Sequence, residues 1–320
     1  MQTVNWGIIG CGNVTEVKSG PGFQKSNNSK LVAVMRRDAK LAQDYATRHE
    51  VSKWYDQADA LIADPDVNAI YVATPPSTHM AYALQAIEAG KPVYIEKPMG
   101  LTYSDCKIVL DASKVHGVPV YVAYYRRALP YFLKIKELLN KNVIGDIRCV
   151  TVTQLRKPTA LDPHDLPWRL IPEISGGGLF HDLGCHTLDV LDMLLGPIAS
   201  SKGHGANQAE ITSAQDTITA SFKFQNGILG TGLWCFDAHT DYECNEIIGT
   251  QGKIKFTTFT FEPIELHTTS GMQSFTIDPP THIQQPLIQT IVDDLLGQGT
   301  ALSTAETAIR TAQVMDDITQ

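Results

Sequence analysis

The sequence lacks the features by which nucleic-acid-binding and membrane proteins are usually recognised. Its 320 residues include 26 Lys and Arg against 34 Asp and Glu, for a formal net charge of −8, and the basic residues are scattered along the chain. Because a protein that holds phosphate groups needs clustered Lys and Arg, we expect no nucleic-acid partner. No apolar run reaches the roughly 20 residues that span a bilayer, so we expect no membrane partner either.

Paired cysteines are also absent. The six cysteines lie far apart, none forms a CxxC pair, and the N-terminus has no signal-peptide pattern. This usage predicts reduced thiols and a cytoplasmic location. Low-complexity tracts, internal repeats and charged tails are missing too, so we expect the whole chain to fold. A chain of 320 residues suits two domains, and small-molecule chemistry is the function class that remains.

The first part of the chain alternates short apolar runs with longer helical patterns. The apolar runs, as expected for strands buried on both faces of a parallel sheet, occupy residues 4–9, 31–35, 69–73, 93–95 and 118–123. Helices are predicted at residues 39–49, 57–63, 78–89 and 103–116, the last with Thr102 as its N-cap and Gly117 as its stop. This alternation predicts an α/β Rossmann-type, doubly wound parallel sheet in a dinucleotide-binding domain at residues 1–123.

From residue 124 onward the pattern changes. Helices predicted at residues 129–139 and 179–195 flank a strand at 147–156 and an irregular, Pro-rich stretch at 157–175. Residues 199–277 show strand-like alternation only, with a hairpin turn at Gln225-Asn226-Gly227, and helices at 284–296 and 304–318 close the chain. Strands in succession predict an α+β domain with a largely antiparallel open sheet at residues 124–320.

A GxG turn, Gly10-Cys11-Gly12, follows the first predicted strand. In a doubly wound sheet this turn needs glycine where the backbone approaches a pyrophosphate and where helix N-terminal N–H groups point at it. The third glycine of the GxGxxG pattern is replaced by Thr15, and Gly20-Pro21-Gly22 interrupts the following helix early. The strand context favours a pyrophosphate cradle, and a turn that serves only helix packing is the alternative. Cys11 is then a small residue of the turn rather than a nucleophile.

The end of the second predicted strand bears on the choice of cofactor. An enzyme that prefers NAD generally places Asp or Glu there, about 20 residues or somewhat more beyond the glycine turn. Arg36 holds that position, with Arg37 beside it, and guanidinium groups suit a 2′-phosphate. Asp38 either contacts the ribose or caps the helix that begins at Ala39. We favour the cap, and therefore NADP over NAD.

The motif Glu96-Lys97-Pro98 comes at the carboxyl end of a predicted buried strand. Open α/β sheets place their ligands at this end of the strands. The ammonium of Lys97 would there donate a hydrogen bond to a substrate hydroxyl or carbonyl and favour the charge that develops on that oxygen. The alternative is a surface ion pair between Glu96 and Lys97.

The stretch GGGLFHDLGCHTLD contains a possible proton relay. Asp182 and His186 are four residues apart and share a face of the predicted helix, so the carboxylate can orient the imidazole and stabilise its protonated form. The alternative is a structural histidine whose ring only makes hydrogen bonds inside the helix. His181 and Cys185 have the same spacing, but no second cluster of His or Cys supplies further ligands, so we expect no metal.

Arginine and aromatic side chains occur together in YYRRALP and PWR, which contain Tyr125, Arg127, Trp168 and Arg169. Rings can stack on sugar faces, and guanidinium groups donate hydrogen bonds to oxygens, so these residues are candidates for binding a polyhydroxylated or anionic ligand. A domain-interface cluster with its charged ends in water is the alternative.

The order of these motifs resembles the Gfo/Idh/MocA family of oxidoreductases over nearly the whole chain. The resemblance rests on Gly10-Cys11-Gly12-Asn13, Glu96-Lys97-Pro98, Arg127 with Pro130, Trp168-Arg169, Gly176-Gly177-Gly178, and Asp182 with His186. Members of the family transfer a hydride between a nicotinamide cofactor and a carbon bearing a hydroxyl or carbonyl, typically of a sugar, inositol or related cyclic polyol. The resemblance implies that Lys97 polarises the reacting oxygen and that His186, oriented by Asp182, exchanges its proton.

The predicted site therefore has three sets of residues. The catalytic set is Lys97, Asp182 and His186. The predicted cofactor-binding set is Gly10, Gly12, Asn13, Val14, Arg36, Arg37, Thr74, Pro75, His79, Glu96 and Lys97. The predicted substrate-binding set is Tyr125, Arg127, Trp168, Arg169, Asp182 and His186. The resemblance also implies a homodimer or homotetramer formed through the sheet of the second domain.

Two other functions suit the same fold. Some proteins of this fold are regulators that sense the cofactor and have lost the catalytic set, and the presence of Lys97, Asp182 and His186 favours an enzyme instead. The other candidate is a trans-dihydrodiol-type dehydrogenase that acts on an aromatic diol, in which the usual histidine is often replaced by tyrosine. The histidine at position 186 favours a sugar or polyol substrate.

Overall fold

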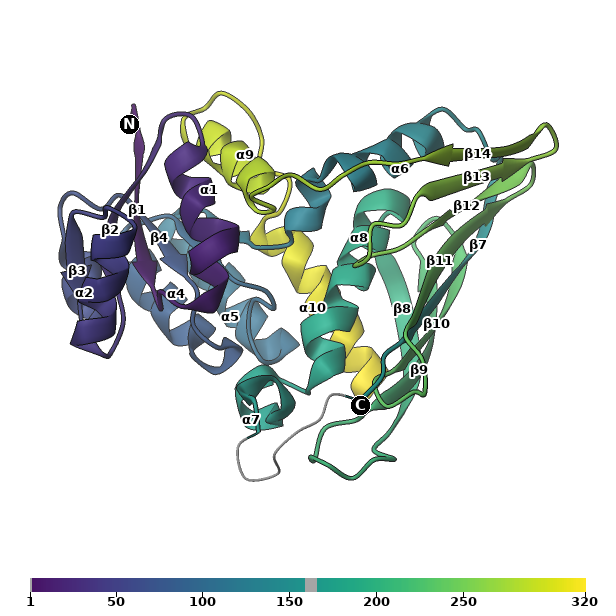
Figure 1. Ribbon diagram of the computed structural model, residues 1–320, viewed down its shortest axis with the longest axis horizontal. Helices are drawn as coiled ribbons and strands as arrows, with labels where there is room; N and C mark the ends of the chain where they lie inside the picture. Colours follow the sequence, from purple (N-terminus) through teal and green to yellow (C-terminus); the bar gives the residue numbers. More distant parts are fainter. Residues whose placement is uncertain (1, 159–165) are drawn as a thin grey trace. The chain divides into compact units, whose positions relative to one another are not determined.

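The computed structural model describes residues 2–158 and 166–320 (Figure 1). The chain divides into two compact units. The N-terminal unit comprises Met1–Ala128 and Pro280–Ile309, and the second unit comprises Leu129–Pro279 and Arg310–Gln320. Part of the irregular stretch predicted at residues 157–175 lies outside the described residues. The described part of that stretch contains two short helices, η4 (Trp168–Leu170) and α7 (Pro172–Ser175).

Six parallel strands form the sheet of the N-terminal unit, in the order β3-β2-β1-β4-β5-β6. Their bounds are β1 Val4–Ile9, β2 Ser29–Met35, β3 Lys53–Tyr55, β4 Ala69–Val72, β5 Val93–Ile95 and β6 Val120–Val122. This order is that of the dinucleotide-binding Rossmann fold, so the predicted doubly wound sheet is confirmed. The strand order reverses between β1 and β4, and in such sheets the ligand crevice lies at the carboxyl ends of the strands beside this reversal.

Helices follow each of these six strands in the chain. They are η1 (Thr15–Ser19, a π-helical turn), α1 (Gly20–Lys25), α2 (Ala39–Arg48), α3 (Ala58–Ala63), η2 (Pro76–Thr78), α4 (His79–Glu88), α5 (Tyr103–His116) and η3 (Tyr125–Ala128). The predicted caps of α5 are confirmed, because the Thr102 side chain accepts a hydrogen bond from Asp105 N and Gly117 adopts the left-handed conformation with φ 65°. The short edge strand β3 was not predicted, since its KWY sequence carries only a weak strand pattern.

The second unit is built on an eight-stranded sheet in the order β14-β13-β12-β11-β7-β10-β9-β8. Its strands are β7 Ile147–Leu155, β8 Ile198–Ala206, β9 Thr217–Phe224, β10 Leu229–Cys235, β11 Tyr242–Gly249, β12 Gly252–Phe256, β13 Ile264–Thr268 and β14 Gly271–Phe275. All neighbouring pairs are antiparallel except β7 with β10. This is the largely antiparallel open sheet that the sequence predicted.

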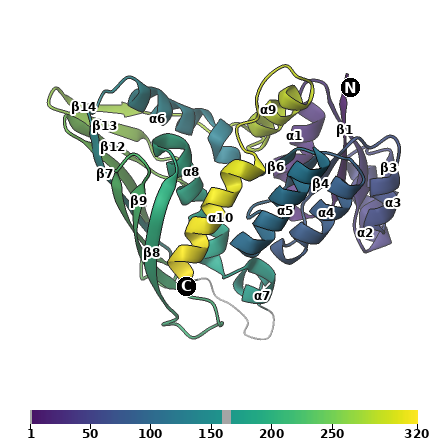
Figure 2. The same ribbon diagram turned by 180° about the vertical axis from the view of Figure 1, so that it is seen from behind.

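One face of this second sheet carries the helices α6 (Pro130–Asn140) and α8 (Cys185–Leu195), as Figures 1 and 2 show. Alternate residues of β9 are buried and exposed, which explains the alternation in its sequence. The end of α10 (Ala305–Thr319) lies along β8, where Ser201 Oγ donates to Asp317 at 3.3 Å. Arg310 joins α10 to α8 by two bonds of 2.8 and 2.6 Å to the carboxylate of Asp192.

The division into units differs from the predicted domain ranges at two places. The prediction assigned all of residues 124–320 to the second domain, whereas residues 124–128 and Pro280–Ile309 group with the N-terminal unit. In this returning segment α9 (Gln285–Leu295) buries Leu287, Ile288, Ile291 and Val292. Asp294 at its end accepts a hydrogen bond of 2.6 Å from the hydroxyl of Tyr121. An amphipathic pattern shows that one face of a helix is buried, but it does not show which unit buries that face. Sequence reasoning therefore missed the return of the chain to the N-terminal unit. Among the described helices, none is long and apolar enough to span a membrane.

Candidate active site

The glycine turn after β1 is shaped by two different requirements. Gly10 has φ +91°, which side-chain-bearing residues rarely adopt, and a Cβ there would lie 2.6 Å from Thr74 Cγ2. A Cβ on Gly12 would meet no neighbouring atom nearer than the Gly10 carbonyl oxygen at 3.9 Å. Gly10 is therefore needed by the fold, and Gly12 keeps the space above the turn open. Open space above this turn is what the predicted pyrophosphate cradle requires.

Thr15, which replaces the third glycine of the usual pattern, holds this turn. Its hydroxyl accepts a hydrogen bond from Gly12 N at 3.0 Å and donates one to the Gly12 carbonyl at 2.8 Å. The helical turn begins at Asn13, so Asn13 and Val14 lie where the N–H groups have no acceptor within the helix. Such N–H groups and the positive end of the helix dipole favour an anion, and cofactor binding by these two residues stays a prediction.

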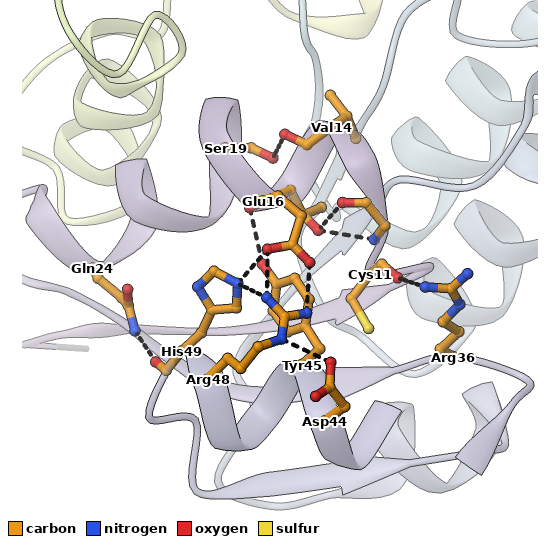
Figure 3. A network of polar contacts seen from close by, with 12 residues as sticks. Cys11, Val14, Glu16, Ser19, Gln24, Arg36, Asp44, Tyr45, Arg48 and His49 are labelled. Atoms are coloured by element: carbon orange, nitrogen blue, oxygen red, sulfur yellow. Dashed lines mark hydrogen bonds and ion pairs between the residues drawn. The ribbon is translucent and has the colours of Figure 1, made fainter. Parts of the chain in front are cut away.

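A network of charged side chains fastens the helix after the turn to α2 (Figure 3). Arg48 donates to both carboxylate oxygens of Glu16, at 2.8 and 2.9 Å, and His49 Nε2 lies 2.6 Å from Glu16 Oε2. The bond from Arg48 is the main reason why the pKa of Glu16 falls to about 2. Tyr45 adds a bond of 2.9 Å from its hydroxyl to the carbonyl of Thr15. Sequence reasoning missed this network, because no motif signals a pair 32 residues apart.

Arg36 reaches the same turn, which bears on cofactor choice. Its Nη1 donates to the carbonyl of Cys11 at 3.5 Å, as Figure 3 shows, and Arg36 and Arg37 are both exposed. Asp38 Oδ1 accepts bonds from Lys40 N at 3.0 Å and Leu41 N at 3.1 Å, so it is the N-cap of α2, as the sequence predicted. Cys11 itself is buried, and burial raises the pKa of its thiol to about 11, so the thiol stays protonated at neutral pH.

The turns after β4 and β5 are joined by His79. Its ring is fully buried, with Nε2 2.7 Å from the carbonyl oxygen of Thr74 and Nδ1 2.8 Å from that of Pro98. Burial lowers the pKa of His79, and the two carbonyl contacts oppose that lowering. His79 was predicted to contact the cofactor, and in the structure both of its ring nitrogens face backbone carbonyls. The residue thereby fixes the spacing between the Thr74-Pro75 turn and the turn that carries Lys97.

Lys97 follows β5, and the Lys97–Pro98 peptide bond is cis. The preceding Glu96 is only 7% exposed, so its carboxylate does not lie on the surface as the alternative interpretation required. That carboxylate accepts hydrogen bonds from the Tyr71 hydroxyl, from Gln284 Nε2 at 2.7 Å and from Lys97 N at 3.2 Å. Glu96 was predicted to contact the cofactor, and in the structure its oxygens are engaged by protein groups.

Asp182 and His186 belong to the second unit, and the helix that carries them is not regular. The segment predicted as one helix begins with a π-helical turn, η5 (Phe180–Gly184), before α8. The three glycines before it, Gly176, Gly177 and Gly178, have φ values of 94°, 159° and 78°. A Cβ on Gly177 would lie 2.1 Å from His181 Nδ1, so this position must be small. Burial lowers the pKa of His181 to about 4, and this histidine is therefore neutral at physiological pH.

The structure brings Asp182 together with two residues of the predicted substrate set. Arg169 Nε lies 3.3 Å from Asp182 Oδ2, and the same guanidinium lies 4.4 Å from the centre of the Trp168 ring. His186 is 4% exposed and meets the ring of Phe259 edge-on at 5.9 Å. The other two predicted substrate residues, Tyr125 and Arg127, lie in η3 of the N-terminal unit and are buried. Lys97 also belongs to that unit.

A pocket of about 560 Å³ lies within the second unit, beside Arg169. Its walls come from the ends of β7 and β10, from η4, from the start of the α8 segment and from the β8–β9 connection. Most of the lining is apolar and includes Leu170, Leu179, Leu183, Ile211 and Phe236, and the polar side chains include Arg156 and Asp237. Its volume is in the range of small-molecule sites. Across the described part of the chain no cluster of three or more metal-ligating side chains is found.

A family model described as "Oxidoreductase family, NAD-binding Rossmann fold" matches residues 4–124, and the "GFO/IDH/MocA C-terminal domain" matches residues 132–255. The chain is 42% identical over 315 residues to "Oxidoreductase P35" of Formosa agariphila, covering 98% of this chain and 97% of that protein. It is 25% identical over 285 residues to trans-1,2-dihydrobenzene-1,2-diol dehydrogenase of Bos taurus, covering 87% and 81%.

The fold is also similar to that of a solved structure, levoglucosan dehydrogenase in complex with NADH and levoglucosan. The TM-score is 0.88 at 23% identity, covering 99% of this chain and 96% of that one. The sheet order, the glycine turn and these matches define an oxidoreductase with an NAD(P)-binding Rossmann domain. More particularly, the chain belongs to the Gfo/Idh/MocA family of oxidoreductases.

Proposed function

We propose that the protein is an NAD(P)-dependent dehydrogenase or reductase that acts on the CH–OH or C=O carbon of a sugar or related cyclic polyol. The observation that carries the proposal is Lys97 at the carboxyl end of β5, with the buried carboxylate of Glu96 bound to its backbone N–H. Parallel sheets bind their ligands at this end, and an ammonium there stabilises negative charge on a substrate oxygen. When bound, the nicotinamide cofactor supplies or accepts the hydride.

Residues of the second unit would accept and return the proton of the substrate hydroxyl. We propose that His186 accepts the hydroxyl proton during oxidation and returns it during reduction, because a hydride leaves a carbinol carbon only as the hydroxyl proton is taken up. Asp182, bound to Arg169, would orient the imidazole and stabilise its protonated form. Trp168 and Arg169 would contact the substrate.

Screening sugars, cyclic polyols and their keto forms against both nicotinamide cofactors, with absorbance of the reduced cofactor as the signal, tests the proposal. Turnover of at least one member of the panel is expected. Turnover of aromatic diols alone would replace it with the second candidate, a dihydrodiol-type dehydrogenase. That candidate is favoured by the relative in Bos taurus and by the apolar lining of the pocket in the second unit. Binding of cofactor with no turnover of any compound would indicate a cofactor-sensing regulator.

For the cofactor we propose NADP rather than NAD. Arg36 lies against the glycine turn, and Asp38, the acidic residue that could otherwise bind the ribose, is already used as the cap of α2. A guanidinium that donates charge-assisted hydrogen bonds to a 2′-phosphate favours NADP over NAD by about 10- to 100-fold. Arg36→Asp is therefore expected to shift the ratio of kcat/KM for NADP to that for NAD by this factor toward NAD.

Lys30→Asp, which makes the same charge reversal at the amino end of β2, is the matched control and should leave the preference unchanged. A wild-type protein that prefers NAD, or an Arg36→Asp variant that keeps the wild-type preference, would show that Arg36 does not bind the 2′-phosphate.

A further inference from the structure

Gln284 is buried inside the N-terminal unit although it comes from the returning C-terminal segment. Its side chain is completely inaccessible to solvent and stands directly before α9. The amide Nε2 donates to Glu96 Oε1 at 2.7 Å, and the amide Oε1 accepts from the Tyr94 hydroxyl at 3.1 Å. The glutamine therefore connects two residues of the strand-end segment that leads into Lys97, from a position 188 residues away in sequence.

The orientation of this amide is fixed by its neighbours. Tyr71 and Tyr94 are fully buried with their rings stacked at 4.9 Å, and burial raises the pKa of both hydroxyls well above the usual value. Both hydroxyls therefore stay protonated and act as donors. Tyr94 donates to Gln284, and Tyr71 donates to Glu96. Because the Glu96 carboxylate can only accept, the amide must present its NH₂ group to it.

The same carboxylate accepts a bond from Lys97 N at 3.2 Å. We propose that Gln284 is a positioning residue, which with Tyr71 holds the Glu96 carboxylate so that it fixes the backbone from which the Lys97 side chain projects. The proposal rests on the proposed function, since it assigns Lys97 to the reaction. A buried carboxylate that loses one of its donors must move or recruit water, and a shift of the adjacent backbone displaces the ammonium from the reacting oxygen.

A purely structural role is the competing explanation, in which Gln284 only anchors the returning segment. The two explanations predict different results for Gln284→Glu, a substitution that keeps the shape of the side chain. At high pH this variant places two carboxylates together, whereas at lower pH a shared proton restores a donor toward Glu96. The other ionisable groups that act electrostatically on this cluster are Tyr71, Tyr94, Tyr125, His79 and Lys97. All of these groups are also present in the wild type. The ratio of the kcat of the variant to that of the wild type therefore reports the effect of the new carboxylate.

The experiment measures kcat, KM and the thermal midpoint for Gln284→Met and Gln284→Glu between pH 6 and 9. For Gln284→Met we expect kcat to fall by about 10- to 100-fold with KM for the cofactor changed by less than about 3-fold. For Gln284→Glu we expect the ratio of its kcat to that of wild type to rise as the pH falls. Gln285→Met is the matched control, because its side chain bonds only to the Lys25 carbonyl among the described residues and should leave kcat unchanged.

A wild-type kcat in Gln284→Met, or a pH-independent ratio for Gln284→Glu, would overturn the proposal.

A second measurement does not depend on turnover. Hydrogen exchange of the peptide covering residues 94–100 should be faster in Gln284→Met than in wild type and unchanged in Gln285→Met. If the wild type turns over none of the panel, the proposed function fails, while this exchange result still tests whether Gln284 holds the Lys97 backbone. Equal exchange in all three proteins would also overturn the proposal.

Discussion

Lys97→Met is expected to lower kcat by about 10²–10⁴-fold while the dissociation constant of the cofactor changes little. The ammonium follows β5 at the end of the sheet where ligands bind, and methionine keeps most of the volume of the side chain but donates no hydrogen bond. The negative charge that develops on the reacting oxygen would then face no cation. The measurement is steady-state kinetics with the best substrate of the panel, together with a fluorescence titration of the cofactor.

The matched control for this prediction is Lys91→Met. Lys91 precedes the amino end of the same strand and donates to the Asp64 carbonyl at 2.7 Å, so it lies away from the ligand end of the sheet. We expect its kcat to remain near that of wild type, and Lys97→Arg, which keeps the charge, to recover part of the lost activity. A near wild-type kcat in Lys97→Met would remove Lys97 from the mechanism.

Features that depend on neighbours in sequence were predictable. Asp38 caps α2 because its carboxylate reaches the N–H groups two and three residues later, and Thr102 caps α5 in the same way. The doubly wound parallel sheet was predicted from the alternation of buried strands with helices, and the antiparallel sheet from strands in succession. For the caps and for most single helices and strands, the signal and the structure that it predicts occupy the same short stretch of chain.

Features that depend on contacts between distant residues were not predictable. Nothing in the Gln284-Gln285 pair at the start of α9 indicates that Gln284 is buried against Glu96 while Gln285 is partly exposed. The same holds for His79, whose two ring nitrogens lie 2.8 and 2.7 Å from the backbone carbonyl oxygens of Pro98 and Thr74. A polar residue in a motif can touch the ligand or support the residues that do, and only the positions of its partners decide between these roles.

His186→Asn is expected to remove an ionisation from the pH dependence of oxidation. Only a neutral imidazole can accept the hydroxyl proton, so in the wild type the rate of oxidation should rise with pH as His186 loses its proton. In the variant this rise should disappear, and kcat should fall by about 10²–10⁴-fold, the usual contribution of a positioned base. Asp182→Asn should also slow turnover, because its carboxylate no longer orients the ring or stabilises the protonated form. The measurement is kcat and kcat/KM across pH 5 to 9.

The matched control is His181→Asn, a substitution of the other buried histidine in the same segment. Because burial lowers the pKa of His181 to about 4, its titration falls below the range of the assay, and its replacement should leave the shape of the profile unchanged. Thermal midpoints of all variants show whether a loss of activity comes from unfolding or from removal of the proton acceptor. If His186→Asn keeps the wild-type profile, another group accepts the proton. Lys97 would then be the first candidate, because it is the other side chain that we propose to contact the reacting oxygen, and a lysine can exchange a proton.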